Sequence, residues 1–312
     1  MINLEFICPK CGSSLEPRSR SYYCPECSKE YPYYLVNGVY IIDFKSLDTA
    51  DCECNRDGKT VCKVELENQI FNYYQTRKAK SNYTGVRHKL IKAGFGSGNR
   101  ILDLGCAEGP YSYLFTEGNE SYGLDCCPKR LLLSEDNAID KGYKALIIGE
   151  GISLPFANAS FDIVVCTEVI EHVVEVRRLI GEIDRVLKKK GRLILSTPNL
   201  VSLGNRLGMI FGKGLKFNPL GFLRGGFYPL TSWALGNMPG KQYSFDSIRY
   251  PEQPLHLRFF TFESLRKLLK RSGFEVKEEM GRGPIFSRIP AFVSRVFKNW
   301  ADDLLIIAVK KD

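Results

Sequence analysis

The sequence predicts an α/β protein: a doubly wound, mainly parallel seven-stranded sheet, preceded by a small cysteine-rich ribbon. Two observations carry this prediction. Short apolar runs alternate with helical patterns from residue 100 onward, as expected when helices cover both faces of a parallel sheet. Two CxxC pairs stand close to the N-terminus. We divide the 312-residue chain into a ribbon at 1–45, a linker at 46–64 and an α/β domain at 65–312.

The ribbon is predicted from four cysteines in the pattern CxxC–x12–CxxC, namely Cys8, Cys11, Cys24 and Cys27. Four thiolates can hold one tetrahedral Zn²⁺, and the metal then supplies folding energy that so short a segment cannot obtain from a core. With the following YPYYLVNGVYIIDF, residues 5–44 resemble the zinc-ribbon family that includes methyltransferase-activator subunits. The resemblance implies a structural zinc that braces a neighbour or binds a protein partner.

The remaining cysteines argue for a reducing compartment. The chain has 11 cysteines, an odd number, and the linker carries Cys52, Cys54 and Cys62. Their CxC–x7–C spacing has no fourth ligand nearby, so we interpret them as thiols rather than a second metal site. No apolar run reaches the ~20 residues of a membrane span, and the N-terminus lacks the pattern of a secretory signal. We therefore expect a cytoplasmic protein.

The net charge of +9 is unevenly distributed. The first fifty residues carry five Lys/Arg against six Asp/Glu. By contrast, Arg185 to Phe245 contains ten Lys/Arg and no acid. This stretch indicates either an anionic partner, such as a phosphate, a nucleic acid or a lipid surface, or simply a solvated basic face.

Seven segments of the α/β domain are predicted strands. They are 100–105, 121–125, 145–149, 161–168, 192–198, 274–280 and 303–311. Two helical patterns, ELENQIFNYYQTRKAK and YTGVRHKLIKAG, precede the first strand. Two more, TFESLRKLLKRSG and IPAFVSRVFKNW, lie between the later strands. Ligands of open α/β sheets bind beyond the carboxyl ends of the strands, so the residues at those ends are the site candidates.

The first of these ends reads LDLGCAEG, an acid followed by glycines that let the backbone approach a ligand closely. Asp125 ends the next strand and is suited to bind the two hydroxyls of a ribose. NAD-binding domains share this arrangement, so the pair predicts a nucleoside cofactor without naming it.

Four stretches, ILDLGCAEG, GLDCCPKRL, LPFANASFDIVVCTEVIEHV and RVLKKKGRLILSTPN, resemble class I S-adenosylmethionine-dependent methyltransferases. The similarity covers about residues 83–312. Two features differ from NAD enzymes: the turn is GCAEG rather than GxGxxG, and the last two predicted strands resemble the terminal antiparallel hairpin of the methyltransferase sheet. The resemblance implies a Rossmann-like methyltransferase fold and S-adenosylmethionine as cofactor.

The resemblance also implies residue roles. Asp103 would orient the methionine amine, Asp125 would bind the ribose, and Glu150 would meet the adenine amino group. Ala107 stands where the family usually has the middle glycine of the turn. The expected cofactor-binding residues are Asp103, Gly105, Ala107, Gly109, Asp125, Glu150 and Thr167.

The acceptor side is predicted from Glu168, Glu171 and His172, which a helix starting at the end of the fourth strand would place on one face. Carboxylates plus one imidazole suit Mg²⁺, Mn²⁺ or Zn²⁺. With the later His256, the pattern resembles ubiquinone-pathway O-methyltransferases and small-RNA 2′-O-methyltransferases, the latter metal-binding. Alternatively His172 packs or caps, or His172 or His256 acts as a general base.

The segment at about 200–255 is predicted to be a basic and apolar lid over the acceptor. Its composition suits an anionic amphiphile, such as a lipid-linked sugar, a prenylated ring or a membrane surface, and also RNA. We expect O-methylation of a small molecule, lipid or saccharide. Two alternatives stay open: an RNA methyltransferase, and a non-catalytic scaffold that only binds the cofactor.

Overall fold

The computed structural model describes residues 4–36, 38–44, 94–127, 131, 138, 141–210, 257–282 and 297–312. The strands are β1 (Glu16–Pro17), β2 (Ser21–Cys24), β3 (Lys29–Val36), β4 (Val39–Asp43), β5 (Arg100–Leu104), β6 (Glu120–Asp125), β7 (Ala145–Ile148), β8 (Phe161–Thr167), β9 (Leu187–Pro198), β10 (Phe274–Arg282) and β11 (Asp303–Lys310). The helices are α4 (Val176–Val186), α5 (Leu203–Ile210) and α8 (Phe262–Arg271), with 3-10 turns η2 (Ser112–Leu114), η4 (Ile170–His172) and η7 (Lys298–Trp300).

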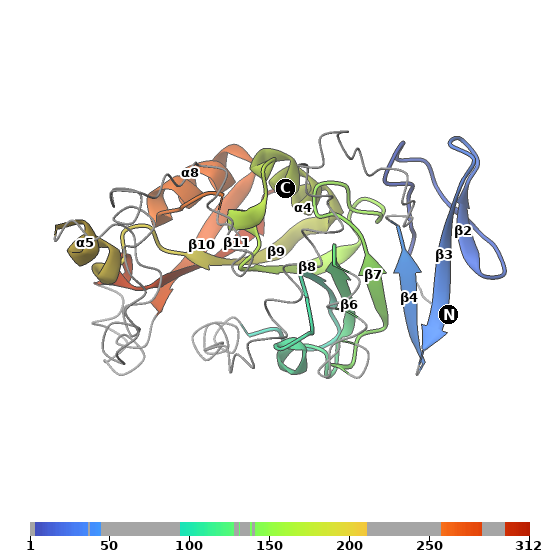
Figure 1. The fold of residues 1–312 in the computed structure, drawn as a ribbon, viewed down its shortest axis with the longest axis horizontal. Helices are drawn as coiled ribbons and strands as arrows, with labels where there is room; N and C mark the ends of the chain where they lie inside the picture. Colours follow the sequence, from blue (N-terminus) through green and yellow to red (C-terminus); the bar gives the residue numbers. More distant parts are fainter. Residues whose placement is uncertain are drawn as a thin grey trace, which may run out of the picture.

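The seven predicted strands lie side by side in the order β7-β6-β5-β8-β9-β11-β10. Strands β5 to β9 pair in parallel, whereas β11 runs antiparallel to both β9 and β10. Figure 1 shows the sheet with α4 and α8 on the same face. The strand order reverses between β5 and β8, and this switch point is where an open α/β sheet binds its ligand.

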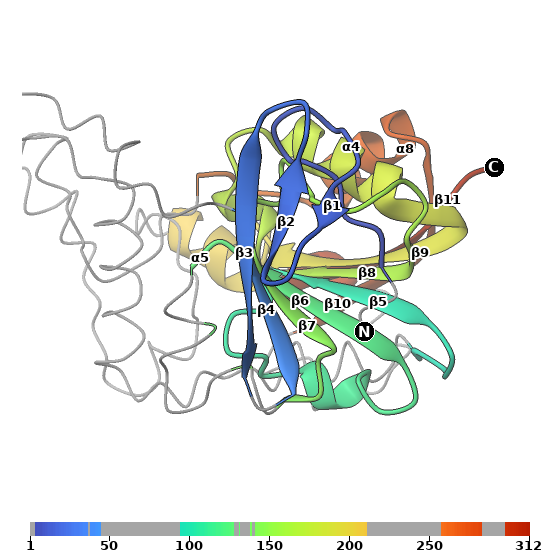
Figure 2. The ribbon, with the colours of Figure 1, turned by 90° about the vertical axis from the view of Figure 1, so that its right-hand side faces the viewer.

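The predicted number of seven strands is wrong, because the sheet has eleven and is mixed. The ribbon does not stand apart: β4 pairs in parallel with β7, in a register that sets Tyr40 beside Ala145 and Asp43 beside Ile148. Figure 2 shows the ribbon strands continuing the sheet past β7. The physical reason is the open edge of β7, whose unpaired N–H and C=O groups need a partner.

The ribbon and the α/β body also share one apolar core. The Phe6 ring lies 5.8 Å from that of Phe156 in the body, and 5.4 Å from that of Phe44. The Tyr31 ring lies 5.1 Å from Phe44, and all four rings are buried. Burial of aromatic rings of this size contributes on the order of 2 kcal/mol each, so the ribbon is held to the body by packing as well as by strand pairing.

Helix α8 confirms the helix expected at TFESLRKLLKRSG. It begins after Thr261, whose Oγ1 accepts the Ser264 N–H at 3.1 Å and so satisfies one of the donors left open at a helix start. No helix in the described parts of the chain is long and apolar enough to cross a membrane. Several predicted features lie outside the described residues: the helices of ELENQIFNYYQTRKAK and YTGVRHKLIKAG, the linker with its three cysteines, the lid from 211 onward, and IPAFVSRVFKNW up to 296.

Candidate active site

Two acids predicted to bind the cofactor lie at the carboxyl ends of neighbouring strands. Asp103 is on β5 and Asp125 ends β6, and both are 6% exposed. Parallel pairing of the two strands brings these ends to the same edge of the sheet. The Asp125 charge contributes to a raised pKa of Asp103, so the two carboxyl groups act on one another electrostatically.

Asp103 is held by a residue that sequence reasoning missed, Tyr143. The Tyr143 hydroxyl donates to Asp103 Oδ2 at 2.6 Å, and both side chains are buried. Burial raises the pKa of Asp103 to about 7, the Tyr143 bond lowers it, and the Asp125 charge raises it. Tyr143 also supports the turn, because a Cβ added at Gly109 would lie 3.0 Å from its ring. No motif marks Tyr143, which lies 40 residues from its partner along the chain.

Tyr143→Phe is expected to weaken binding of S-adenosylhomocysteine about 10-fold at pH 7, because the bond to Asp103 orients the carboxylate and favours its ionised form. The positively charged amine of the ligand also favours that form, so affinity should rise with pH through about 7. In the variant the midpoint of that rise moves to higher pH. Calorimetric titration from pH 6 to pH 9 measures both effects.

The control is Tyr113→Phe, since Tyr113 is 50% exposed, whereas Tyr143 is buried. A pH profile of Tyr143→Phe that superimposes on that of the unmodified protein would contradict a positioning role for the hydroxyl. Weaker binding without a displaced midpoint would assign Tyr143 to packing alone.

The glycine turn after β5 is built for close approach. Gly105 has a φ of +76°, and a Cβ at this position would lie 2.3 Å from Val169 Cγ2, so only glycine fits. Ala107 has a φ of +49°, which costs a non-glycine residue about 1–2 kcal/mol. Its N–H donates to Asp125 Oδ2 at 2.9 Å, and Cys127 N–H donates to Oδ1 at 2.8 Å. Asp125 therefore fixes the turn that carries alanine in place of the usual glycine.

These residues fit S-adenosylmethionine. Each carboxylate oxygen of Asp125 keeps a second lone pair that can accept a ribose hydroxyl. Asp103 places a titratable carboxyl beside the turn, where an amine would sit. Glu150 follows β7 and is half-buried, and Thr167 closes β8 on the same edge of the sheet. Two acids beside a close-approach turn suit a ligand with hydroxyls and positive charge.

The second group of predicted residues does not form the expected helix. Glu168 has a φ of +56° at the end of β8, and only Ile170–His172 forms a 3-10 turn, η4. The left-handed residue redirects the chain immediately after the strand, so the i, i+3, i+4 geometry of an α-helix does not arise. Glu168 Oε1 accepts the Ser196 hydroxyl at 2.6 Å, which ties it to β9 instead.

Glu171 is the most unusual side chain of the site. It is 1% exposed; its Oε2 accepts the Thr197 hydroxyl at 3.0 Å, and its Oε1 has no hydrogen-bond partner in the described part of the chain. Burial first, and then the Glu168 charge, raise the pKa of Glu171 well above its ordinary value. His172 Nε2 lies 3.9 Å from the same Oε1. A buried carboxyl with an unpaired oxygen points to a ligand or a proton at this place.

Of the four predicted acceptor-side residues, His256 lies outside the described ones. The next residue, Leu257, donates its N–H to the Glu171 carbonyl oxygen at 2.8 Å, and Arg258 donates to the same oxygen at 3.2 Å. Among described residues, the four ribbon cysteines alone form a group of three or more ligands whose atoms all lie within 4.8 Å. Glu171 and His172 thus approach one another, whereas Glu168 does not complete a three-ligand group with them.

The ribbon cysteines fit a zinc ion. Their four Sγ atoms lie within 4.8 Å of one another, and Cys11 and Cys24 are 3.5 Å apart. Tetrahedral Zn²⁺ with Zn–S bonds of about 2.3 Å requires sulfur atoms roughly this close. Hydrogen bonding to Ser13 lowers the pKa of Cys11 to about 6, which favours the thiolate that a metal binds. None of the eight described cysteines forms a disulfide.

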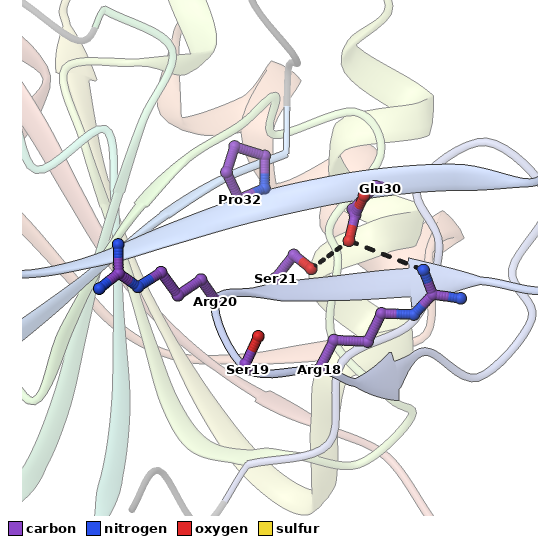
Figure 3. A pocket seen from close by; sticks show the side chains of 6 residues that line it. All are labelled: Arg18, Ser19, Arg20, Ser21, Glu30 and Pro32. Carbon is purple, nitrogen blue, oxygen red and sulfur yellow. Dashed lines mark hydrogen bonds and ion pairs between the residues drawn. The ribbon is translucent and has the colours of Figure 1, made fainter.

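A separate pocket of about 470 Å³ lies on the ribbon, lined by Arg18, Ser19, Arg20, Ser21, Glu30 and Pro32 (Figure 3). Ser21 Oγ donates to Glu30 Oε1 at 2.5 Å, and Arg18 Nη1 lies 3.8 Å from the same oxygen. Because Glu30 offsets the Arg18 charge, this surface does not form a concentrated basic patch.

Comparison with known proteins identifies the class. Residues 102–195 match the family model described as a methyltransferase domain. A probable S-adenosylmethionine-dependent methyltransferase of Mycolicibacterium smegmatis is 25% identical over 212 residues, which cover 65% of this chain and 63% of that protein. A mitochondrial ubiquinone biosynthesis O-methyltransferase of Schizosaccharomyces pombe is 29% identical over 166 residues, 47% of this chain and 60% of that protein. The chain thus spans about three fifths of each relative.

Among solved structures, the complex between the Haloferax volcanii Trm112 methyltransferase activator and a methyltransferase matches with a TM-score of 0.50 and 15% identity. The match covers 79% of this chain and 98% of the matched chain. This likeness concerns the fold. The domain match and the relatives, rather than this likeness, support the predicted class of S-adenosylmethionine-dependent methyltransferases.

Proposed function

We propose that the protein transfers a methyl group to a hydroxyl of a small-molecule, lipid or saccharide acceptor. The observation that carries this proposal is Glu171: its buried Oε1 has no hydrogen-bond partner among the described residues and lies 3.9 Å from His172 Nε2. This pair follows β8 at the switch-point edge that also bears Asp103 and Asp125. A proton-handling pair beside a cofactor site suits an acceptor whose hydroxyl must lose a proton. The likeness to ubiquinone biosynthesis O-methyltransferases, although distant, agrees with this chemistry.

The proposed roles divide the site into two halves. When bound, S-adenosylmethionine supplies an activated methyl group on a sulfonium centre. Asp125 binds its ribose, Asp103 its amine and Glu150 its adenine, while the turn from Gly105 to Gly109 leaves room for the methionine moiety. On the other side of the switch point, His172 holds the proton that leaves the acceptor hydroxyl, and Glu171 holds His172 in position and shares its charge.

A divalent metal is the alternative to a proton-accepting His172 in this proposal, because His172 Nε2 can bind an ion or accept a proton but not both at once. Glu171 Oε1 and His172 Nε2 are 3.9 Å apart, a separation that two ligands of one ion with bonds of about 2.1 Å can span. The Leu257 N–H donates to the carbonyl oxygen of Glu171 at 2.8 Å, so the described segment that begins at Leu257 contacts this turn. Mg²⁺, Mn²⁺ or Zn²⁺ at this position would lower the pKa of an acceptor hydroxyl.

RNA is the second candidate acceptor, favoured by the acid-free basic stretch from Arg185 to Phe245. Some of its charge is already committed in the described residues, since Arg185 pairs with Glu182 and Lys188 with Asp162. The ribbon adds no basic surface, because its acids outnumber its bases across residues 1–50. These pairings favour a small-molecule, lipid or saccharide acceptor over a nucleic acid.

Labelling tests this proposal. Purified protein is incubated with methyl-labelled S-adenosylmethionine and an extract of the source cells, with and without a divalent-metal chelator. The extract is then separated into lipid, soluble small-molecule, RNA and protein fractions. We expect label in the lipid or small-molecule fraction, lost with the chelator. Label in RNA would overturn the proposed acceptor, and label that survives chelation would overturn the metal. Release of no S-adenosylhomocysteine with any fraction would favour the scaffold.

A further inference from the structure

A set of contacts joins the ribbon to the loop that follows β7, at residues 149–157. Ile7 N–H donates to the Pro155 carbonyl and Ala157 N–H donates to the Glu5 carbonyl, each at 3.1 Å. The Ser153 hydroxyl donates to the Pro9 carbonyl at 2.5 Å. These three bonds lie on one short stretch of the ribbon, residues 5–9. Residues 5–9 of the ribbon therefore hold the loop at 149–157 by hydrogen bonds along its length.

The Pro9 carbonyl belongs to the first zinc knuckle, because Pro9 stands between Cys8 and Cys11. The knuckle is a closed turn in which Gly12 N–H donates to the Cys8 carbonyl and Cys8 N–H donates to the Ser13 carbonyl, both at 2.8 Å. Cys8 is 1% exposed and shares the apolar core with body residues. An ion held by the four thiolates would fix this turn, and with it the direction of the Pro9 carbonyl.

The other end of the loop reaches the cofactor site. Gly149 N–H donates to the Asp125 carbonyl at 3.1 Å, which ties the loop to the acid expected to bind ribose. Ser153 N–H donates to the Glu150 carbonyl at 3.1 Å, so Ser153 and Glu150 close one turn. Ser153 therefore donates one hydrogen bond from its backbone to Glu150 and another from its side chain to the knuckle. Two hydrogen bonds of Ser153 thus connect the zinc knuckle to the residue expected to meet adenine.

We propose that the zinc knuckle is a positioning element of the cofactor site: the knuckle holds Ser153, Ser153 holds the turn of Glu150, and metal occupancy of the ribbon thereby sets cofactor affinity. This inference rests on the proposed role of Glu150. It assigns to the structural zinc a function in binding, in addition to folding. The coupling is local and needs no movement of the sheet. It passes through the side-chain hydrogen bond of Ser153 to Pro9 and through the main-chain hydrogen bonds of Ser153 to Glu150 and of Gly149 to Asp125.

Ser153→Ala tests the coupling without removing a metal ligand. Loss of one neutral hydrogen bond is expected to raise the Kd for S-adenosylhomocysteine about 3- to 10-fold, with zinc content unchanged. The matched control is Ser160→Ala: Ser160 also bonds a backbone carbonyl, that of Ala157 at 2.7 Å, but makes this bond within the loop rather than to the ribbon. An unchanged Kd in Ser153→Ala would overturn the inference.

A second measurement uses the full chain with zinc withdrawn by a chelator, under conditions where circular dichroism shows that the sheet persists. We expect faster backbone hydrogen exchange at 149–157 and weaker binding of S-adenosylhomocysteine. Unchanged exchange there would overturn the coupling. Glu150→Gln separates the two proposals: if it leaves the Kd unchanged while Ser153→Ala raises it, the coupling holds and the role of Glu150 fails.

Discussion

Cys24→Ser is expected to abolish stoichiometric zinc binding and to lower the unfolding free energy by on the order of 5 kcal/mol, part of the ~10–16 kcal/mol that structural zinc contributes in small domains. Cys24 is fully buried and lies 3.5 Å from Cys11, so a serine hydroxyl there is a poor ligand that cannot move to solvent. The loss should spread beyond the ribbon, because β4 pairs with β7 and Phe6 packs on Phe156.

Zinc content and denaturant unfolding measure the two effects. Cys126→Ser is the control, since Cys126 is exposed and lies outside the four-thiol group. Because the loss of stability extends from the ribbon to the body, we expect Cys24→Ser to unfold in one cooperative transition at a lower denaturant concentration than the unmodified protein. An early, separate transition of the ribbon is not expected. Two separated transitions would show that β4 can leave β7 without cost to the body. A variant that keeps one zinc ion per chain would contradict the four-thiolate site.

Local sequence patterns predicted the seven body strands because their apolar runs and flanking turns are local features. The pairing of β4 with β7 is different: it joins residues 39–43 to 145–148, and nothing in VYIID distinguishes an edge strand of the ribbon from a strand inside a larger sheet. Pairing partners at that separation depend on which edge the rest of the fold leaves open.

The site divides in the same way. Asp103 and Asp125 could be predicted because strand ends and glycine turns mark them. Tyr143 could not, since its role arises from a hydrogen bond across the fold. The helix expected at Glu168 does not form: the i, i+3, i+4 spacing of charged residues is compatible with a helix but does not require one, and the chain enters the left-handed region at Glu168. Ser196 and Thr197 lie within the predicted strand 192–198, but no local pattern marks them as donors to Glu168 and Glu171.

Glu171→Gln is expected to stabilise the protein and to inactivate it. The Glu171 carboxyl is buried and its Oε1 lacks a hydrogen-bond partner in the described residues, which costs about 1–3 kcal/mol relative to a satisfied group. A glutamine keeps the shape and can still accept the Thr197 hydroxyl bond, but on folding it neither buries a charge nor takes up a proton. Folding therefore gains, whereas proton or metal handling with His172 is lost, by about 10²- to 10⁴-fold in methyl transfer.

The pH dependence of stability gives an independent readout. Burial raises the pKa of Glu171 well above 4.5, so the folded state binds a proton that the unfolded state has released. In that range the unfolding free energy falls as pH rises, because the folded protein must either keep the extra proton or bury a charge. Glu171→Gln removes this contribution, so its unfolding free energy should decline less steeply above pH 4.5.

Thermal unfolding from pH 4.5 to pH 8, with and without Mg²⁺ or Mn²⁺, measures both consequences. If a divalent ion binds here, it stabilises the ionised carboxylate and should raise the melting temperature of the unmodified protein but not of Glu171→Gln. Glu263→Gln is the control, since Glu263 is exposed and paired with Lys267 on α8. A variant that is less stable than the unmodified protein would show that the carboxylate is satisfied in the folded state. If Glu171→Gln still transfers methyl groups, Glu171 takes no part in the mechanism. The glutamine keeps only the hydrogen bond from Thr197, which has a structural role.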